Sequence, residues 1–320
     1  MNVLVTGSCG YIGPVVVRAL RAAGHTVTGY DLGWFGEDDG STWFIRGDIR
    51  EPLVHSAWPD VVVHLAGLSN DPMGDLDPDL TSDINVDGTN RIVLHHQPVR
   101  HVVVSSCAVY GVQSTPADEN TSENPLTAYA RAKFLIDDWL HYSPVRDQYQ
   151  GLNAISLRLG TVFGPAPNHR LDLVVNRMVF DALNNGGVRV TGNAARPLVH
   201  VEDVASAVLW AVEGDQRGIY NIIGENVRMK ALGRAIAHYA GVPVKYASSG
   251  ADTRDYMASG EKALRAGWAP TRSVEGSLPA LFEHTKQYDQ YDLPDHVRLL
   301  QLQRLIDEGT LDPKTLRNAA

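Results

Sequence analysis

The chain has 320 residues, enough for one large domain or for two smaller ones that share a core. Its formal net charge of −9 argues against a protein that binds nucleic-acid phosphates, and no apolar stretch is long enough to cross a bilayer. The only two cysteines, Cys9 and Cys107, and the scattered histidines predict neither a disulfide framework nor a metal site, and we expect a cytoplasmic protein.

The first half of the chain alternates short β-like runs with helical patterns. Near-continuous Val, Ile and Leu runs, typical of strands covered on both faces, predict strands over Asn2–Thr6, Thr26–Tyr30, Thr42–Ile45, Val61–Leu65, Val102–Ser105 and Ala154–Leu159. Helical spacing between them predicts helices over Tyr11–Ala23, Pro78–His95 and Leu126–Tyr142. The alternation predicts an α/β fold with a doubly wound parallel sheet, whose ligands bind beyond the carboxyl ends of the strands.

The second half has a different sequence pattern, with loop-rich stretches after about Phe163. The run "LVHVEDVASAVLWAVEG" predicts a helix with Glu202 and Asp203 in its first turn. We expect residues 1–165 to form the sheet domain, with 196–224 returning to it, 166–277 to form a smaller substrate-binding region and 278–320 to form a helical extension. In that extension, "HVRLLQLQRLIDEG" is interpreted as a packing or interface helix and not as a site.

Three glycines, Gly7, Gly10 and Gly13, lie between the first strand and the first helix in "VLVTGSCGYIG". Glycine has no Cβ, so the backbone can approach a pyrophosphate closely, and the helix presents free N–H groups to that anion. Asp31 ends the second strand, where a carboxylate accepts hydrogen bonds from an adenosine ribose and repels a 2′-phosphate. This pattern favours NAD over NADP, although Asp31 could also be a simple turn residue.

The GxxGxxG spacing and several later motifs resemble the extended short-chain dehydrogenase/reductase family, and within it the nucleotide-sugar epimerases and dehydratases. The motifs are "GDI" at Gly47–Ile49, "HLAG" at His64–Gly67, "INVDGTNRIV", "SSCAVYG" at Ser105–Gly111, "YARAK" at Tyr129–Lys133, "LRLGTVFGP" and "RPLVHVEDVA". The resemblance implies a Rossmann-type sheet with a smaller C-terminal substrate-binding region, and a homodimer formed through Pro78–His95 and Leu126–Tyr142.

The resemblance also implies which residues bind NAD. They come from the glycine loop, the second strand, the adenine-edge and fourth-strand motifs and the catalytic segments: Gly7, Gly10, Tyr11, Ile12, Gly13, Asp31, Leu32, Asp48, Ile49, Leu65, Ala66, Gly67, Asn85, Ser105, Tyr129 and Lys133.

Tyr129 and Lys133 are four residues apart on a predicted helix, so they share a face. A nearby cation stabilises a phenolate, whose pKa is otherwise near 10, so Tyr129 could act as a base near neutrality. By resemblance Ser106 is the catalytic hydroxyl that bonds the reacting sugar oxygen, with Ser105 as the alternative one position earlier. Without the surrounding motifs, a Tyr–Lys pair at this spacing would be interpreted as two surface residues.

The resemblance further implies a set of substrate contacts: Ser69, Asn70, Ser106, Cys107, Thr161, Asn176, Arg196 and Arg254. Dehydratases of the family carry an Asp-Glu pair directly after the catalytic Ser or Thr, and here that pair is Cys107–Ala108. The Glu that related decarboxylases carry in this segment is also absent. Thr161 stands where many 4-epimerases have an asparagine, so the sequence leaves the substrate open.

These residues predict an NAD-dependent nucleotide-sugar 4-epimerase, an isomerase that oxidises C4 to a ketone and returns the hydride. The first alternative is an NAD(P)-dependent reductase or dehydrogenase of a nucleotide-activated keto-sugar, which would exchange its cofactor at each turnover. The second alternative is a non-catalytic NAD-binding regulator, which would have no need of Ser106, Tyr129 and Lys133. The sequence identifies neither the base nor the sugar of the substrate.

Overall fold

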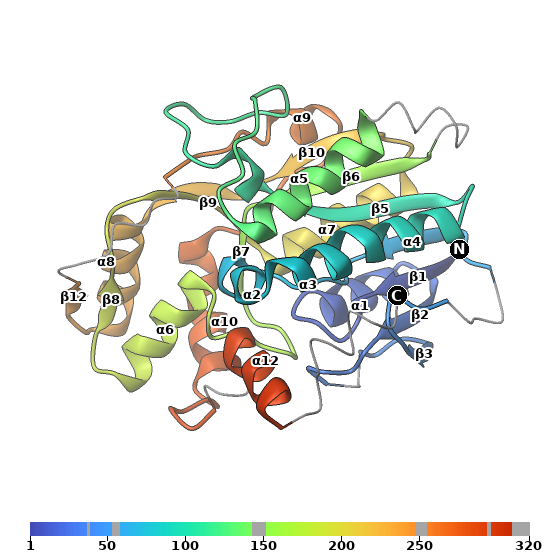
Figure 1. Ribbon diagram of the computed structural model, residues 1–320. Helices are drawn as coiled ribbons and strands as arrows, with labels where there is room; N and C mark the ends of the chain where they lie inside the picture. Colours follow the sequence, from blue (N-terminus) through green and yellow to red (C-terminus); the bar gives the residue numbers. More distant parts are fainter. Residues whose placement is uncertain (37–38, 53–57, 143–151, 248–254, 293–295, 309–320) are drawn as a thin grey trace.

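The computed structural model describes residues 1–36, 39–52, 58–142, 152–247, 255–292 and 296–308. Its centre is a sheet of seven strands in which every neighbouring pair runs parallel (Figure 1). The order is β10-β6-β5-β4-β1-β2-β3, for strands β1 (Asn2–Thr6), β2 (Thr26–Asp31), β3 (Trp43–Arg46), β4 (Val61–His64), β5 (Arg100–Ser106), β6 (Ala154–Leu159) and β10 (Gly218–Ile222). The predicted doubly wound parallel sheet is confirmed.

Helices cover both faces of this sheet, as its continuous apolar strands require. On one face, α1 (Gly13–Ala22) packs against α7 (Val201–Glu213), and Val16 and Val208 are fully buried together with Val5 of β1. The apolar side chains of these two helices therefore form the larger core of the protein with the central strands.

The opposite face carries a second group of helices. They are α2 (Asp71–Leu76), α3 (Pro78–Ser82), the π-helical η1 (Asp83–Asp87), α4 (Gly88–His95) and α5 (Ala128–His141). The segments α3, η1 and α4 follow one another without a break, so the helix predicted over residues 78–95 contains a π-helical stretch. That stretch carries Asn85, whose amide bonds both the N–H and the carbonyl of Leu68, at 2.8 and 2.9 Å.

The smaller region stands beyond the carboxyl ends of the large sheet (Figure 1). One sheet has the order β11-β9-β7, and β8 pairs with β12. The elements are β7 (Thr161–Phe163), α6 (Val174–Asn184), β8 (Val188–Val190), β9 (Ala195–His200), β11 (Glu225–Arg228), α8 (Met229–Ala240), β12 (Val244–Tyr246) and α10 (Val274–Thr285). Helices α6, α8 and α10 share an apolar core with β8 and β9.

Several segments link the two parts of the molecule. Within residues 196–224, β9 joins the small sheet, α7 covers the large one and β10 is its seventh strand. The short 3₁₀ turn η2 (Cys107–Tyr110) follows β5, and α9 (Glu261–Arg265) packs near β10. Helix α12 (Arg298–Asp307) comes back to contact α2 (Figure 1).

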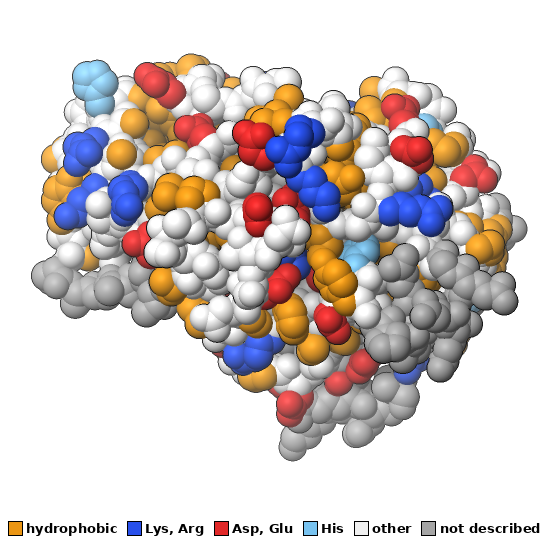
Figure 2. Space-filling model, turned by 90° about the horizontal axis from the view of Figure 1, so that it is seen from above, with side chains coloured by type: hydrophobic (Ala, Val, Ile, Leu, Met, Phe, Trp, Pro, Cys, Tyr) orange, Lys and Arg blue, Asp and Glu red, His pale blue; other side chains and the backbone are white. Residues whose placement is uncertain are grey.

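The surface charges and the hydrophobicity of the helices are two further properties of the molecule as a whole. On the face seen in Figure 2, acidic and basic side chains are interspersed, and no large basic surface stands out on that face. Among the residues that the structure describes, no helix combines the length and the hydrophobicity needed to span a membrane.

A buried guanidinium fixes α5 to the sheet. Arg158 of β6 is fully buried, and its Nε lies 2.8 Å from Oδ2 of Asp137 on α5. Its Nη2 lies 2.7 Å from Oε1 of Glu123, and its Nη1 donates to the hydroxyl of Tyr110 at 3.0 Å. One side chain thus joins β6, α5, η2 and the loop before α5, which together hold the catalytic segments.

Replacing Arg158 should therefore be strongly destabilising. Arg158→Met leaves the carboxylate of Asp137 buried without its cation, and loss of one partner of a buried pair lowers the free energy of unfolding by about 3–5 kcal/mol. Urea unfolding followed by circular dichroism measures this change.

The matched control is Arg18→Met, which breaks an ion pair with Glu202 whose side chains are 58% and 35% exposed. That change should lower the free energy of unfolding by no more than about 1 kcal/mol. Equal losses in the two variants would show that the Arg158 network does not anchor α5.

Candidate active site

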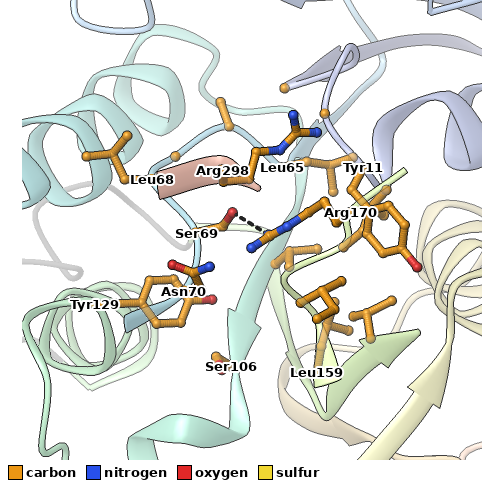
Figure 3. Close-up of a pocket in the computed structure, with 18 of the residues that line it drawn as sticks. Tyr11, Leu65, Leu68, Ser69, Asn70, Ser106, Tyr129, Leu159, Arg170 and Arg298 are labelled. Carbon is orange, nitrogen blue, oxygen red and sulfur yellow. Dashed lines mark hydrogen bonds between the residues drawn. The ribbon is translucent and has the colours of Figure 1, made fainter. Parts of the chain in front are cut away.

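A cavity of about 530 Å³ opens at the carboxyl ends of the central strands (Figure 3). The loop between β1 and α1 and the ends of β2, β4 and β5 supply one part of its wall. Residues of α5 and of the smaller region supply the rest. The cavity therefore lies where a doubly wound sheet binds its ligands.

At its glycines, the loop between β1 and α1 contributes backbone to the cavity wall. Gly7 has a φ of +72°, and a Cβ there would lie 2.5 Å from the backbone nitrogen of Ala66. A Cβ on Gly13 would overlap the carbonyl oxygens of Gly7 and Ser8. Helix α1 begins at Gly13 with no side-chain cap, so the positive end of its dipole is directed at this loop. Pro14 has no N–H, and the N–H of Val15 already donates to the carbonyl oxygen of Ile12. This cradle fits the pyrophosphate of a dinucleotide.

Asp31 is fixed beside this loop at the end of β2. Its Oδ2 accepts a hydrogen bond from the backbone nitrogen of Cys9 at 3.1 Å, and its Oδ1 accepts one from Gly33 at 2.8 Å. Burial raises the pKa of the Asp31 carboxyl, while these two N–H groups lower it. The carboxylate is held in the cavity wall, within reach of a ribose.

Most of the residues predicted to bind NAD line the cavity: Gly7, Gly10, Tyr11, Ile12, Gly13, Asp31, Leu32, Asp48, Ile49, Leu65, Ala66, Gly67, Ser105, Tyr129 and Lys133. Asn85 does not line it. A Cβ on Gly67, whose φ is +147°, would lie 2.7 Å from Oδ1 of Asn85, so this amide supports the β4 loop from beneath.

The structure distinguishes the two adjacent serines. The hydroxyl of Ser105 donates to Oδ2 of Asp137 at 2.9 Å and is turned into the protein. The hydroxyl of Ser106 accepts a hydrogen bond from the backbone nitrogen of Ala108 at 3.2 Å, and Ser106 lines the cavity together with Tyr129. Successive strand residues point to opposite faces, so only one of the two can present its hydroxyl to a ligand.

Burial shifts the pKa values of both residues predicted to be catalytic on α5. It raises the pKa of Tyr129 to about 12, against smaller lowering effects of the Ser106 hydroxyl and the Arg170 cation. It lowers the pKa of Lys133 to about 8, against the raising effect of Asp137. The ammonium of Lys133 donates to the carbonyl oxygen of Val104 at 2.7 Å. Lys133 thus remains mostly charged at neutral pH inside a buried site.

The predicted substrate contacts divide into residues that line the cavity, a residue outside the described part of the chain, and two residues whose side chains turn away. Ser69, Asn70, Thr161 and Arg196 line the cavity with Ser106. The side chain of Arg196 is buried, with its Cζ 5.7 Å from the centre of the Tyr256 ring. Arg254 lies outside the described residues.

Two predicted contacts require correction, because the structure turns their side chains away from the cavity. The thiol of Cys107 is fully buried and donates to the carbonyl oxygen of Arg158 at 3.3 Å. The amide of Asn176 donates to the carbonyl oxygen of Arg170 at 2.9 Å and accepts from the backbone nitrogen of Gly164 at 3.1 Å. Asn176 therefore shapes the loop that carries Arg170, and does not line the cavity itself.

The cavity wall also contains an ion pair that the sequence does not predict. Arg170 lies 2.6 Å from Oδ2 of Asp172 and donates to the hydroxyl of Ser69 at 2.9 Å (Figure 3). Asn70 donates to the same Oδ2 of Asp172 at 2.8 Å. Arg170 and Asp172 lie in the loop between β7 and α6. The sequence of this loop shows no helix or strand pattern, so the ion pair is recognised only from the contacts in the structure. The C-terminal segment was also misread, because Arg298 of α12 lines the cavity.

A family model and several known proteins are similar in sequence to this chain. A model of the NAD-dependent epimerase/dehydratase family matches residues 3–223. A UDP-glucose 4-epimerase of Mycolicibacterium smegmatis is 30% identical over 269 residues, covering 76% of this chain and 84% of the relative. A UDP-glucose 4-epimerase of Rhizobium meliloti is 27% identical over 307 residues, covering 84% and 92%.

Solved structures show the same architecture. A complex of Thermus thermophilus UDP-glucose 4-epimerase with NAD aligns with a TM-score of 0.77 at 26% identity, over 89% of this chain and 99% of that one. MoeE5 in complex with UDP-glucuronic acid and NAD aligns with a TM-score of 0.78 at 26% identity, over 90% and 99%.

The buried Lys133 should make stability depend on pH. Its pKa falls from 10.5 in the unfolded chain to about 8 in the folded protein. Between these values the unfolded chain holds a proton that the folded protein has released, so folding becomes more favourable as the pH rises. Relative to Lys133→Met, the wild type should gain up to about 3 kcal/mol from pH 8 to pH 10.5.

Urea unfolding of cofactor-free wild type and Lys133→Met at several pH values measures this difference. Groups common to both proteins cancel in the comparison. A difference that stays constant or falls across this range would mean that the ammonium of Lys133 is not desolvated in the folded state.

Proposed function

This chain belongs to the NAD-dependent epimerase/dehydratase family, and on that basis we propose that it is an NAD-dependent nucleotide-sugar 4-epimerase. The observation that carries the proposal is one cavity that joins the glycine cradle to Ser106, Tyr129 and Lys133. The relatives named UDP-glucose 4-epimerase make UDP-hexoses the first substrates to test.

The residues present fit NAD, because the tight glycine turn brings the loop backbone into the cavity wall, where it can approach a pyrophosphate, and the Asp31 carboxylate lies in the same wall. When bound, NAD supplies the acceptor for the C4 hydride and then its donor. In the proposed reaction, Tyr129 takes the proton of the C4 hydroxyl and later returns it, while Ser106 hydrogen-bonds the same oxygen.

Tyr129 needs a lower pKa for this step, because burial outweighs the opposing effects in the ligand-free site and leaves its pKa at about 12. The Ser106 hydroxyl and the Arg170 cation act in that direction in the free site. Lys133, which carries its charge below a pH of about 8, adds a further cation on the same face of α5. Arg196 is suited to the substrate diphosphate, because a guanidinium matches phosphate oxygens with a planar fork.

The segment after Ser106 favours epimerisation over dehydration. Ala108 lines the cavity and has no proton to transfer. The thiol of Cys107 is directed away from the cavity, and burial raises its pKa. Dehydration needs an acid and a base beside the sugar, and neither position of this pair supplies one.

A reductase or dehydrogenase of an activated keto-sugar is the second candidate, since it would use the same three residues. What separates it from an epimerase is whether the cofactor stays bound between turnovers. The regulator alternative is disfavoured, because Ser106 and Tyr129 both line the cavity with Lys133.

We also propose that the chain forms a homodimer through α4 and α5, where Leu94 and Leu135 are 37% and 48% exposed. Apolar side chains on neighbouring helices are suited to a helical interface. Sedimentation velocity should show a dimer at micromolar concentration, and Leu135→Glu should shift the protein toward monomer. A wild type that sediments only as a monomer would reject this interface.

The test of function begins with the purified protein. We expect near-stoichiometric NAD in the supernatant after denaturation, measured by chromatography, because an enzyme that returns its own hydride must retain its cofactor. UDP-glucose and UDP-galactose should then interconvert, or another nucleotide hexose should invert at C4. Protein that lacks bound nucleotide and reduces a keto-sugar with added NADH would favour the reductase.

Within the same test, Tyr129→Phe should fold and retain NAD but lose turnover by about 100- to 10,000-fold, as expected when a general base is removed. Tyr142→Phe is the control, because Tyr142 follows α5 and is 63% exposed. Near-wild-type activity in Tyr129→Phe would contradict the mechanism.

A further inference from the structure

Arg298 opens α12, far beyond residues 3–223 that the family model matches. Together with Val297 and Leu299 it lines the cavity. Its side chain is 2% exposed, and Figure 3 shows it in the cavity wall close to Arg170. A segment expected to serve only for packing therefore brings a buried cation to the site.

The guanidinium of Arg298 is only partly satisfied in its hydrogen bonds. Its Nη1 donates to Oε1 of Gln301 at 2.6 Å, and its Cζ lies 3.9 Å from the centre of the Phe35 ring. Its Nη2 is buried and has no hydrogen-bond partner, and among the described residues no carboxylate lies within ion-pair distance of it. A buried cation in such a place is unfavourable unless an anion binds it.

The charges around Arg298 indicate where that anion would lie. Burial, and to a lesser extent the Arg170 cation, lower the pKa of Arg298 to about 9, while the more distant carboxylates of Asp172 and Asp31 raise it. Two neighbouring guanidiniums that face one cavity repel each other when the cavity holds no ligand. A phosphate group between or beside them would relieve that repulsion.

We propose that Arg298 binds the diphosphate of the dinucleotide cofactor, so that the C-terminal segment forms part of the cofactor site. Phe35, on which the guanidinium lies, follows β2. The same stretch carries Asp31, which bonds the glycine loop at Cys9. In the proposed function the substrate diphosphate is bound by a different arginine, Arg196, whose guanidinium lies over the ring of Tyr256.

The inference rests on the dinucleotide site of the proposed function and adds that the cofactor dissociates slowly from it. The glycine loop offers backbone N–H groups to a diphosphate from one side, and Arg298 would add a charged fork from a different segment of the chain. A cofactor held from both sides dissociates slowly. That is the behaviour required of an enzyme that reuses one NAD for many turnovers.

The test compares ligand binding to cofactor-free wild type, Arg298→Met, Arg298→Lys and Arg304→Gln by calorimetry. The ligands are NAD, ADP, UDP and NADP. Arg304 is the matched control, because it lies on the same helix, its side chain is 47% exposed and it pairs with Glu308 at 3.9 Å. Methionine keeps an unbranched chain against Phe35, and lysine keeps the charge without the fork.

We expect Arg298→Met to weaken the binding of NAD and ADP by about 10- to 100-fold, as for the loss of a charge-assisted hydrogen bond, and to leave UDP binding within about twofold. Arg298→Lys should give an intermediate loss, and Arg304→Gln none. Without ligand, Arg298→Met should unfold at the same temperature as the wild type or higher, since it removes a buried cation without a carboxylate.

Each other outcome would overturn the inference. Unchanged NAD and ADP binding would show that Arg298 touches no phosphate of the cofactor. Weaker UDP binding alone would assign the guanidinium to the substrate diphosphate, and an effect on NADP alone would assign it to a 2′-phosphate. A ligand-free Arg298→Met that unfolds earlier and binds every ligand less well would show a structural role. A wild type that binds no NAD would overturn the proposed function first, before any variant is compared.

Discussion

The close approach of the β1–α1 loop to the end of β4 is the constraint on which the rest of the site depends. At Gly7 a side chain would lie 2.5 Å from the backbone of Ala66, and at Gly13 it would overlap the loop itself. The chain can therefore make this turn only with glycine at both positions, and the turn brings the loop backbone to the cavity wall. Because the strands are parallel, their carboxyl ends meet at this same edge, and Asp31 and Ser106 reach one cavity.

Burial then sets the electrostatics of that cavity. On α5, Tyr129, Lys133 and Asp137 follow one another at four-residue spacing, so they share one face of the helix. Burial disfavours both the phenolate and the ammonium, and the Asp137 carboxylate restores part of the charge of Lys133. Asp137 is itself held by Arg158, so an ion pair beneath the site helps to determine the protonation state of the residues within it.

The two halves of the molecule contribute different chemistry. The large sheet supplies the glycine cradle and the groups suited to proton transfer. The later part of the chain supplies three cations to the cavity wall: Arg170, Arg196 and Arg298. Arg170 is paired with Asp172, whereas Arg298 has no carboxylate at such a distance among the residues that the structure describes. These arginines of the cavity wall thus come from segments that lie outside the βαβ units.

The sequence by itself determined six of the strands in the large sheet, their parallel arrangement and the glycine loop, because periodicity, turn residues and motif spacing are local properties of the chain. It also placed Tyr129 and Lys133 on one helix face. Only the tertiary structure decided that the hydroxyl of Ser105 bonds Asp137 while that of Ser106 remains at the cavity, that the side chains of Cys107 and Asn176 turn away from it, and that Arg170 and Arg298 enter its wall. These outcomes depend on contacts between different segments, from Ser105 with Asp137 to Arg170 with Ser69 and Arg298 with Phe35, which no local pattern records.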